Sequence, residues 1–181
     1  MIFKMTKLSG ACVVALDCHT DERGYFARTF CEREFAEHGL PERFPQCNVS
    51  FNHSAGTLRG LHYQAAPQRE AKLVRCTRGA IYDVAVDLRL GSPTRFEWVG
   101  VELTADNGRA LFIPEGFAHG FITLCDASEV FYQMSDFYRP EGARGVRWND
   151  PTLAIRWPRE PRVLSERDAT YPDFDPASFD G

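Results

Sequence analysis

The sequence predicts an all-β protein, a sandwich or barrel of short strands with a few short helices. Segments rich in β-branched and aromatic residues recur along the chain, and turn-forming residues separate them. Helical segments do not alternate with these strands, which favours a sandwich or barrel. Aromatic residues make up 13% of the chain, which suits a β-rich core with ring-lined pockets. We expect one domain over residues 1–181, a length that can enclose one large core.

Eight segments have the composition expected of strands. The first, ACVVAL at 11–16, has too short an apolar core for a signal peptide and indicates a first strand. Turn signals such as GSPT at 91–94 and PEG at 114–116 separate the later segments. The eight predicted strands cover residues 11–16, 57–64, 71–77, 80–89, 95–103, 109–113, 118–124 and 129–137.

Two short helices are expected outside these strands. The first covers 30–38, where Gly39 can cap the helix and Pro41 lies just beyond it. The second covers 164–169, where Ser165 can act as the N-cap and Asp168 occupies the capping-box position. The tail at 169–181 is rich in proline and aspartate, and we expect it to follow the surface irregularly.

Charge and cysteine content limit the classes of function. A net charge of −4 and a pI near 5.7 argue against a nucleic-acid partner or an anionic membrane surface. The six cysteines are scattered without a C-x-x-C pair, which indicates reduced, mostly buried thiols rather than disulfides or a zinc site. No residue run is long and apolar enough to span a membrane. We therefore expect a soluble, cytoplasmic protein.

LRGLHYQ, at 58–64, places an arginine, a glycine and a histidine in one predicted strand. Strict alternation would put Arg59 and His62 on opposite faces. A bulge at Gly60 would re-aim the chain so that both face inward. Together with Lys72, such a site suits an anionic substrate and proton chemistry. The alternative is that Arg59 and Lys72 pair with surface carboxylates, the commoner fate of charged side chains.

GRALFIPEGFAHGF, at 108–121, resembles the second signature of the cupin superfamily, whose fold is a small jelly-roll barrel. In that fold His119 would point into the barrel mouth. The alternative is a core-facing histidine bonded to the backbone. The resemblance makes the fold prediction more specific: an all-β, cupin-type jelly-roll barrel with a few short helices.

Cupins often bind a metal, so the possible ligands matter. The first cupin signature normally supplies two histidines, but here Gln64 replaces the second, which leaves His62, Glu70 and His119. Losing one imidazole weakens such a site, and Lys72 would repel a divalent cation. We expect a barrel with neither a metal nor another cofactor.

A wider resemblance covers most of the chain. Seven segments, in order, resemble the dTDP-4-dehydrorhamnose 3,5-epimerase family between about Asp21 and about Asp168, and PEGFAHGF with LRGLHYQ is the most diagnostic pair. This implies epimerisation at C3 and C5 of a nucleotide-diphospho-4-keto-6-deoxyhexose, by removing a proton and returning one to the opposite face. The segments are DERGYF (21–26), LRGLHYQ (58–64), AKLVR (71–75), DVAVDLRLGSPT (83–94), PEGFAHGF (114–121), EVFYQMSDFY (129–138) and RGVRWNDP (144–151).

The resemblance assigns four catalytic roles. His62 is the base, and Asp168 is the carboxylate that orients it and stabilises the imidazolium. Tyr132 is the acid on the other side of the sugar, suited to this role because a phenol stays protonated at neutral pH. Lys72 lies beside the C4 oxygen and stabilises the enolate.

The resemblance also implies a binding surface, formed in part across a homodimer interface. His119 and Tyr138 line the sugar and nucleoside pockets, and Arg59 faces the diphosphate. The residues near the nucleotide are Arg23, Phe26, Gln46 and Asn48.

Arg28 stands where the family commonly has a glutamate near the nucleoside. An arginine can only donate hydrogen bonds, so an inward Arg28 would favour another base or an added phosphate contact. The alternative is that Arg28 turns to solvent, while thymine binds through Arg23, Gln46 and Asn48.

Other functions stay open at this point. One is an epimerase that acts on a single carbon, C3 or C5, or on another nucleotide-linked 4-keto sugar. A second is a metal-dependent cupin oxygenase, and a third is a non-catalytic sugar-binding cupin. Binding alone does not need an acid and a base on opposite faces, so His62 and Tyr132 argue against the third.

Overall fold

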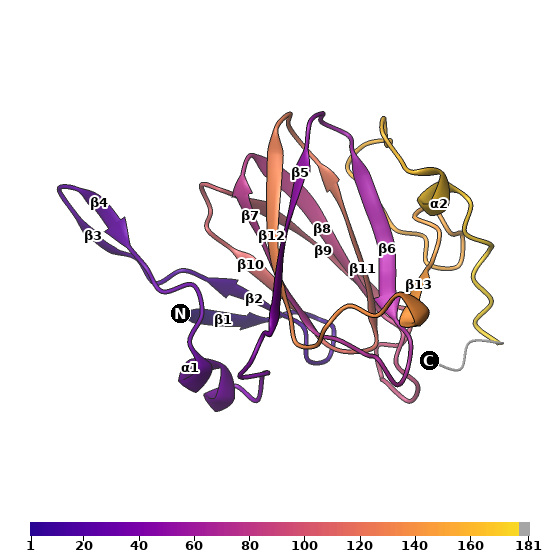
Figure 1. The fold of residues 1–181 in the computed structure, drawn as a ribbon, viewed down its shortest axis with the longest axis horizontal. Coiled ribbons are helices and arrows are strands. Elements are labelled where there is room, and N and C mark those ends of the chain that lie inside the picture. The colour runs from indigo at the N-terminus through magenta and orange to yellow at the C-terminus, as the bar shows by residue number, and fades with distance from the viewer. Residues whose placement is uncertain (178–181) are drawn as a thin grey trace.

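Two antiparallel sheets form the body of the protein in this computed structural model, which describes residues 1–177 (Figure 1). All strand pairs within the sheets are antiparallel. The predicted all-β class is confirmed. The six-stranded sheet has the order β1 (Ile2–Met5), β2 (Cys12–Ala15), β10 (Ala110–Ile113), β7 (Lys72–Arg78), β12 (Ser128–Met134) and β5 (Gln46–Asn52). The five-stranded sheet has the order β13 (Ala143–Gly145), β6 (Leu58–Gln64), β11 (Phe117–Thr123), β8 (Ala80–Asp87) and β9 (Trp98–Thr104).

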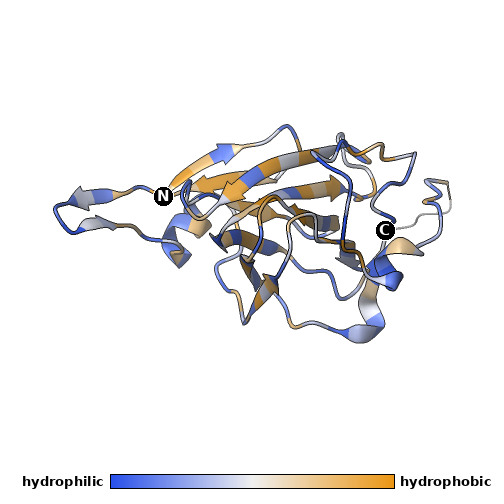
Figure 2. Ribbon diagram, turned by 90° about the horizontal axis from the view of Figure 1, so that it is seen from above, coloured by the Kyte–Doolittle hydropathy of each residue, from blue (hydrophilic) through white to orange (hydrophobic). Residues whose placement is uncertain are grey.

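The main core lies between the facing sheets, because alternate residues of each strand point inward. Figure 2 shows apolar stretches concentrated on the strands of the body. Burying these side chains from both sheets supplies the main stabilisation of the sandwich. The core side chains include Val74, Cys76, Leu111, Ile113 and Val130 from one sheet and Ile81, Ala85, Leu103, Phe117 and Phe121 from the other.

Each sheet is also covered on its outer face. Helix α1 (Glu32–Glu37) places the fully buried Phe35 in a cluster with Leu73 and Phe112 on the six-stranded sheet. The outer face of the five-stranded sheet packs against the chain after β13, including Trp157 and Phe174. Because the outer faces are packed in this way, polar side chains that could form a functional site gather between the sheets, where the core does not fill the space.

A small hairpin projects from one end of the body, formed by β3 (His19–Asp21) and β4 (Gly24–Phe26) (Figure 1). It is mostly hydrophilic or neutral in Figure 2. Two large side chains on it, Tyr25 and Phe26, are 61% and 74% exposed. The hairpin thus carries aromatic surface that this chain does not cover.

Several predicted elements are confirmed, and local interactions explain where each of them begins or ends. Helix α2 (Glu166–Ala169) begins at Ser165, whose Oγ accepts a hydrogen bond from the Asp168 N–H at 3.1 Å. Strand β9 begins at Trp98 instead of residue 95, because Phe96 has a φ of +67° and cannot continue a strand. Strand β8 stops at Asp87, whose carboxylate accepts hydrogen bonds from the turn that follows, and β12 stops at Met134.

Five strands were not predicted: β1, β3, β4, β5 and β13. A short 3₁₀ helix, η1 (Pro140–Gly142), precedes β13. The predicted irregular tail is confirmed up to residue 177, and residues 178–181 lie outside the described part. Within this tail, the Phe174 N–H donates a hydrogen bond to the Asp150 carboxylate.

The thiols are free, as predicted, but the expectation that most are buried is wrong. Only Cys12 and Cys76 are buried, whereas Cys18, Cys47 and Cys125 are exposed. Among the helices of residues 1–177, none has the length and apolar character needed to cross a membrane.

Candidate active site

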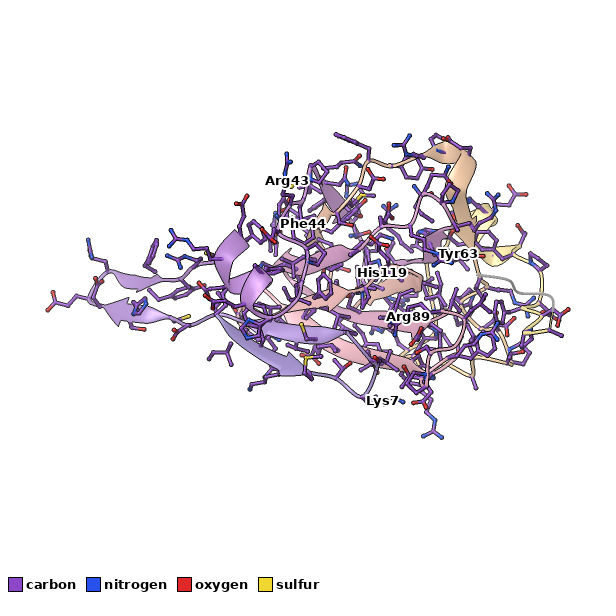
Figure 3. The ribbon with its side chains drawn as sticks, turned by 90° about the horizontal axis from the view of Figure 1, so that it is seen from below. Lys7, Arg43, Phe44, Tyr63, Arg89 and His119 are labelled. Carbon is purple, nitrogen blue, oxygen red and sulfur yellow. The ribbon has the colours of Figure 1, made fainter. Side chains whose placement is uncertain are left out.

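A cavity of about 570 Å³ opens between the two sheets. Strands β5, β7 and β12 form one wall, and β6 and β11 form the other. His119 marks this region in Figure 3, among the strands of the body and away from the hairpin. The predicted site residues that line it are Gln46, Asn48, Arg59, His62, Lys72, His119, Tyr132 and Tyr138.

Strand β6 brings Arg59 and His62 to the same cavity through the predicted bulge. Opposite it on β11, His119 pairs with His62 and Phe121 pairs with Arg59, so two residues of β6 face one residue of β11. Gly60 makes this possible. Its φ is +134°, and an added Cβ would lie 2.5 Å from the Cα of Gly120.

His62 and Asp168 form the predicted dyad across 106 residues of sequence, with 2.7 Å between Nε2 and Oδ1. Burial acts most strongly on Asp168 and would raise its pKa. Hydrogen bonds from His62, the Gly60 N–H and Ser165, together with the electrostatic interaction with His62, outweigh burial and lower the pKa below its usual value. An ionised Asp168 only accepts, so His62 Nε2 carries the proton and Nδ1 is free to act as a base.

Tyr132 lies on the opposite wall from His62, because β12 belongs to the six-stranded sheet. Burial raises the pKa of Tyr132, and the negative charge of Glu70 raises it further, while Arg59 acts in the other direction. The phenol therefore remains protonated at neutral pH. A base and an acid face one another across the cavity.

Lys72 and Glu70 form a buried ion pair in the cavity wall, with 3.1 Å between Nζ and Oε1. Each residue is only 8% exposed. The sequence suggested Glu70 only as a metal ligand and missed this pairing. A carboxylate two residues from Lys72, at the start of a predicted strand, was the available signal.

His119 is held by Asp83, with 2.7 Å between Nε2 and Oδ1. Asp83 is completely buried. This carboxylate replaces the backbone partner considered for a core histidine. Asp83 was missed as a site residue, although a charged residue inside the apolar segment AIYDVAV was a usable signal.

Arg59 is held by an amide, not by a surface carboxylate. Its Nε donates to Asn52 Oδ1 at 2.8 Å, and the Asn52 amide donates in turn to the carbonyls of Ser50 and Ser128. Asn52 is 2% exposed. The alternative of surface ion pairs is therefore wrong for Arg59, and Lys72 pairs with a buried carboxylate instead.

The three residues considered as metal ligands are each engaged differently. His62 contacts Asp168, His119 contacts Asp83, and Glu70 contacts Lys72. Over residues 1–177 the structure contains no group of three or more histidine, cysteine or acidic side chains that could hold a metal ion. The donors therefore do not form a ligand set.

Three predicted binding residues do not reach the cavity within one chain. Arg23 pairs with Asp21 on the hairpin, and its side chain is 89% exposed. Phe26 lies on the same hairpin. Arg28 donates to Glu34 of α1 at 2.8 Å, so the inward placement of Arg28 is wrong for this chain by itself.

Comparison with known proteins identifies the family. The sequence model of the family described as dTDP-4-dehydrorhamnose 3,5-epimerase matches residues 5–176. The chain belongs to this family. It is 48% identical over 172 residues to the dTDP-4-dehydrorhamnose 3,5-epimerase of Methanothermobacter thermautotrophicus, covering 93% of this chain and 92% of that relative.

Solved structures of epimerases have the same fold. The dTDP-4-dehydrorhamnose 3,5-epimerase of Bacillus anthracis, with TDP and PPi bound, gives a TM-score of 0.92 at 40% identity and covers 96% of this chain and 99% of that one. A 3'-monoepimerase from Streptomyces bikiniensis, in complex with dTDP-quinovose, gives a TM-score of 0.86 at 34% identity and covers 94% of this chain and 86% of that one. The predicted cupin-type fold is confirmed.

Proposed function

We propose that this protein is a dTDP-4-dehydrorhamnose 3,5-epimerase that inverts C3 and C5 of a dTDP-linked 4-keto-6-deoxyhexose. It is an isomerase that binds a dTDP-sugar. The observation that supports this best is the placement of the His62–Asp168 dyad and the Tyr132 phenol on opposite walls of one cavity. Inversion needs this arrangement, because the proton leaves one face of a carbon and returns to the other.

The reaction follows from the groups in the cavity. The C4 ketone acidifies the hydrogens on C3 and C5, and His62 Nδ1 removes one of them. The electron pair of the C–H bond forms a double bond to C4, and the π pair of the C4 carbonyl moves onto O4, which gives an enolate. Lys72 stabilises the charge on O4. Tyr132 then donates its proton to the opposite face of the same carbon, and solvent restores the protonation of His62 and Tyr132.

The substrate's other groups have matching surfaces in the cavity. Arg59, fixed by Asn52, is suited to bind the diphosphate through charge-assisted hydrogen bonds. His119 faces the sugar, while Gln46, Asn48 and Tyr138 bind the nucleoside. Gln46 and Tyr138 are already linked, because the Tyr138 N–H donates to Gln46 Oε1 at 3.0 Å.

A homodimer completes the nucleotide end of this site in our proposal. Arg23 and Phe26 lie on a hairpin that projects away from the body of its own chain (Figure 1). Strand β5 is an edge strand, with Val49 and Phe51 exposed beside the cavity. The hairpin of a second copy, docked near β5, would bring Arg23 and Phe26 to the nucleotide. We place the enzyme in the cytoplasm, where free cysteines are the usual state.

Arg28 bears on the choice of nucleotide base. Its ion pair with Glu34 supports the alternative in which it does not contact the base. Thymine would then bind through Arg23, Gln46 and Asn48.

NMR of the reaction in deuterated water tests the function. With dTDP-4-dehydro-6-deoxyglucose, we expect deuterium at both C3 and C5 and formation of dTDP-4-dehydrorhamnose. Exchange and inversion at one carbon would identify a single-carbon epimerase, and no exchange at either carbon would contradict the proposal.

Metal independence is a prediction of the same mechanism. Lys72 stabilises the enolate, so a Lewis acid is not required. We expect full turnover after exhaustive dialysis against a chelator. Loss of turnover that a divalent ion restores would contradict this and favour the metal-dependent oxygenase.

A further inference from the structure

Glu70 is a buried acid that the mechanism above does not use. It lies just before β7, lines the cavity and is 8% exposed. One carboxylate oxygen contacts Lys72, whereas the other, Oε2, is buried and has no hydrogen-bond partner among residues 1–177. A buried carboxylate costs free energy unless it is compensated, so its position calls for an explanation.

The geometry links Glu70 to two groups of the mechanism, Lys72 and Tyr132. Its carboxylate anchors the ammonium of Lys72 at 3.1 Å, and Lys72 has two further N–H groups for the substrate oxygen. Tyr132 lines the same cavity from β12, which lies between the edge strand β5 and β7 in the six-stranded sheet. Glu70 therefore lies where it can act on the enolate-stabilising cation and on the proton donor.

We propose that Glu70 is a positioning residue of the reaction, which fixes Lys72 in the cavity wall through their ion pair and adds a negative charge that favours the protonated form of Tyr132. The inference rests on the proposed function for the roles of Lys72 and Tyr132. It adds a residue that acts through Lys72 and Tyr132.

The charges around Tyr132 support this role. Glu70 and Arg59 act on the phenol in opposite directions, and Glu70 raises its pKa. The other titratable or charged residues that line the cavity are Lys72, His62, His119, Tyr63, Tyr138, Arg144 and Arg167. Without Glu70 the cavity becomes more positive, and a more positive cavity favours the tyrosinate.

The test compares Glu70→Gln with wild type. The change keeps the shape and removes the charge, so we expect the alkaline limb of the kcat profile to move to lower pH. At neutral pH kcat should fall about 10- to 100-fold, the range for losing a hydrogen bond to a charged group, with little change in KM. Glu70→Asp keeps the negative charge, so it should return the alkaline limb of the kcat profile to the pH of the wild type. The matched control is Glu42→Gln, an exposed acid with the same change in net charge.

A second measurement needs no turnover, so it separates this inference from the proposed function. Ultraviolet absorbance titration of each protein, minus the same protein carrying Tyr132→Phe, isolates the ionisation of Tyr132. We expect Tyr132 to ionise at lower pH in Glu70→Gln than in wild type. An unchanged titration would overturn the inference, even if the enzyme were an epimerase.

A buried lysine without its partner can unfold the single variant. In that case Lys72→Met is compared with the double variant Lys72→Met/Glu70→Gln, which contains neither charge. The double variant should ionise Tyr132 at lower pH than Lys72→Met alone, and equal titrations would overturn the inference.

Discussion

Two histidines of the cavity are backed by buried carboxylates, but their exposure differs. The side chain of His62 is 41% exposed, whereas that of His119 is 10% exposed. A base must reach the hydrogen that it removes, so the more accessible ring is suited to proton transfer and the less accessible one to binding. The same contact, from a histidine Nε2 to a buried carboxylate oxygen, thus supports two different tasks.

Replacing His62 with asparagine should abolish most exchange at both C3 and C5, because one base serves both carbons. We expect a loss of about 10²- to 10⁴-fold, the usual contribution of a general base. Asp168→Asn should be impaired similarly, since the ring is no longer held with Nδ1 unprotonated. Proton NMR in deuterated water measures both rates, and the exposed His53→Asn is the control. Exchange at the wild-type rate in His62→Asn would contradict the assignment.

Changing Tyr132 to phenylalanine should separate exchange from inversion. The base remains and can return a deuteron to the face from which it took the proton, so deuterium should enter with retained configuration. Inverted product should fall strongly. Tyr82→Phe is the matched control, because Tyr82 packs on the outer face near Trp157. An equal loss of exchange and inversion would mean that Tyr132 mainly positions the sugar.

The residues that hold other residues were harder to predict than those that they hold. The partner of His62, Asp168, was predicted through the family resemblance, but the partners of Arg59 and His119 were not. Those partners depend on how strands lie against one another in the fold, which a single sequence does not reveal. Asn52, for example, meets Arg59 only because the chain reverses between β5 and β6.

At the scale of elements, strand β6 shows how one inserted residue changes a site. Its bulge lets Arg59 and His62 share the cavity, although three positions separate them along the strand. A regular strand would turn one of them toward the outer cluster.

Gly60→Ala should damage both stability and activity. The new Cβ would meet the backbone of Gly120 at 2.5 Å, in a backbone conformation that favours glycine. We expect the free energy of unfolding to fall by at least about 2 kcal/mol, and kcat to fall as His62 moves. Gly24→Ala is the control, since its φ is +123° but nothing lies within 4 Å. Denaturant unfolding measures the stability of both variants, and kinetic assays measure kcat. Equal losses of stability in the two variants would show that only the backbone conformation matters, not the contact with Gly120.

Strands of the apolar core were predictable, whereas edge strands were not. The segments of β7, β8, β10 and β11 contain apolar runs with clear turns between them. Strand β5, QCNVSFN, lines the cavity, and along it the polar Gln46, Asn48 and Ser50 are half-buried whereas Val49 and Phe51 are exposed. This reverses the usual pattern of apolar inside and polar outside, so composition could not identify it.

At the scale of the whole molecule, the hairpin and the body of one chain serve different sites in our proposal. A homodimer has two identical sites by symmetry, and each would take its hairpin from the other copy. The family resemblance placed Arg23 and Phe26 near the nucleotide, partly across a dimer interface, but it could not show that they lie on a hairpin projecting from the body of their own chain.

Mixing two inactive variants tests whether each site takes its hairpin from the other copy. Arg23→Ala impairs the hairpin, and His62→Asn impairs the cavity. After joint unfolding and refolding in equal amounts, half of the dimers should be mixed, and each mixed dimer should have one intact site. We expect recovery of about one quarter of wild-type turnover. Refolding each variant alone is the control, and no recovery on mixing would contradict the shared site.

The position of the acid and the base on different sheets limits what the enzyme can invert. Facing sheets in a sandwich lie about 10 Å apart, so the separation between the two groups is set by the thickness of the core. A single flat ring fits in such a slot with a reacting group above and below it. A substrate with a large substituent standing up from the ring would push the walls apart and lose one of the two contacts. Enlarging a core side chain remote from the cavity, such as Leu111, would have the same effect, so the packing of the core between the sheets bears on stereochemistry as well as on stability.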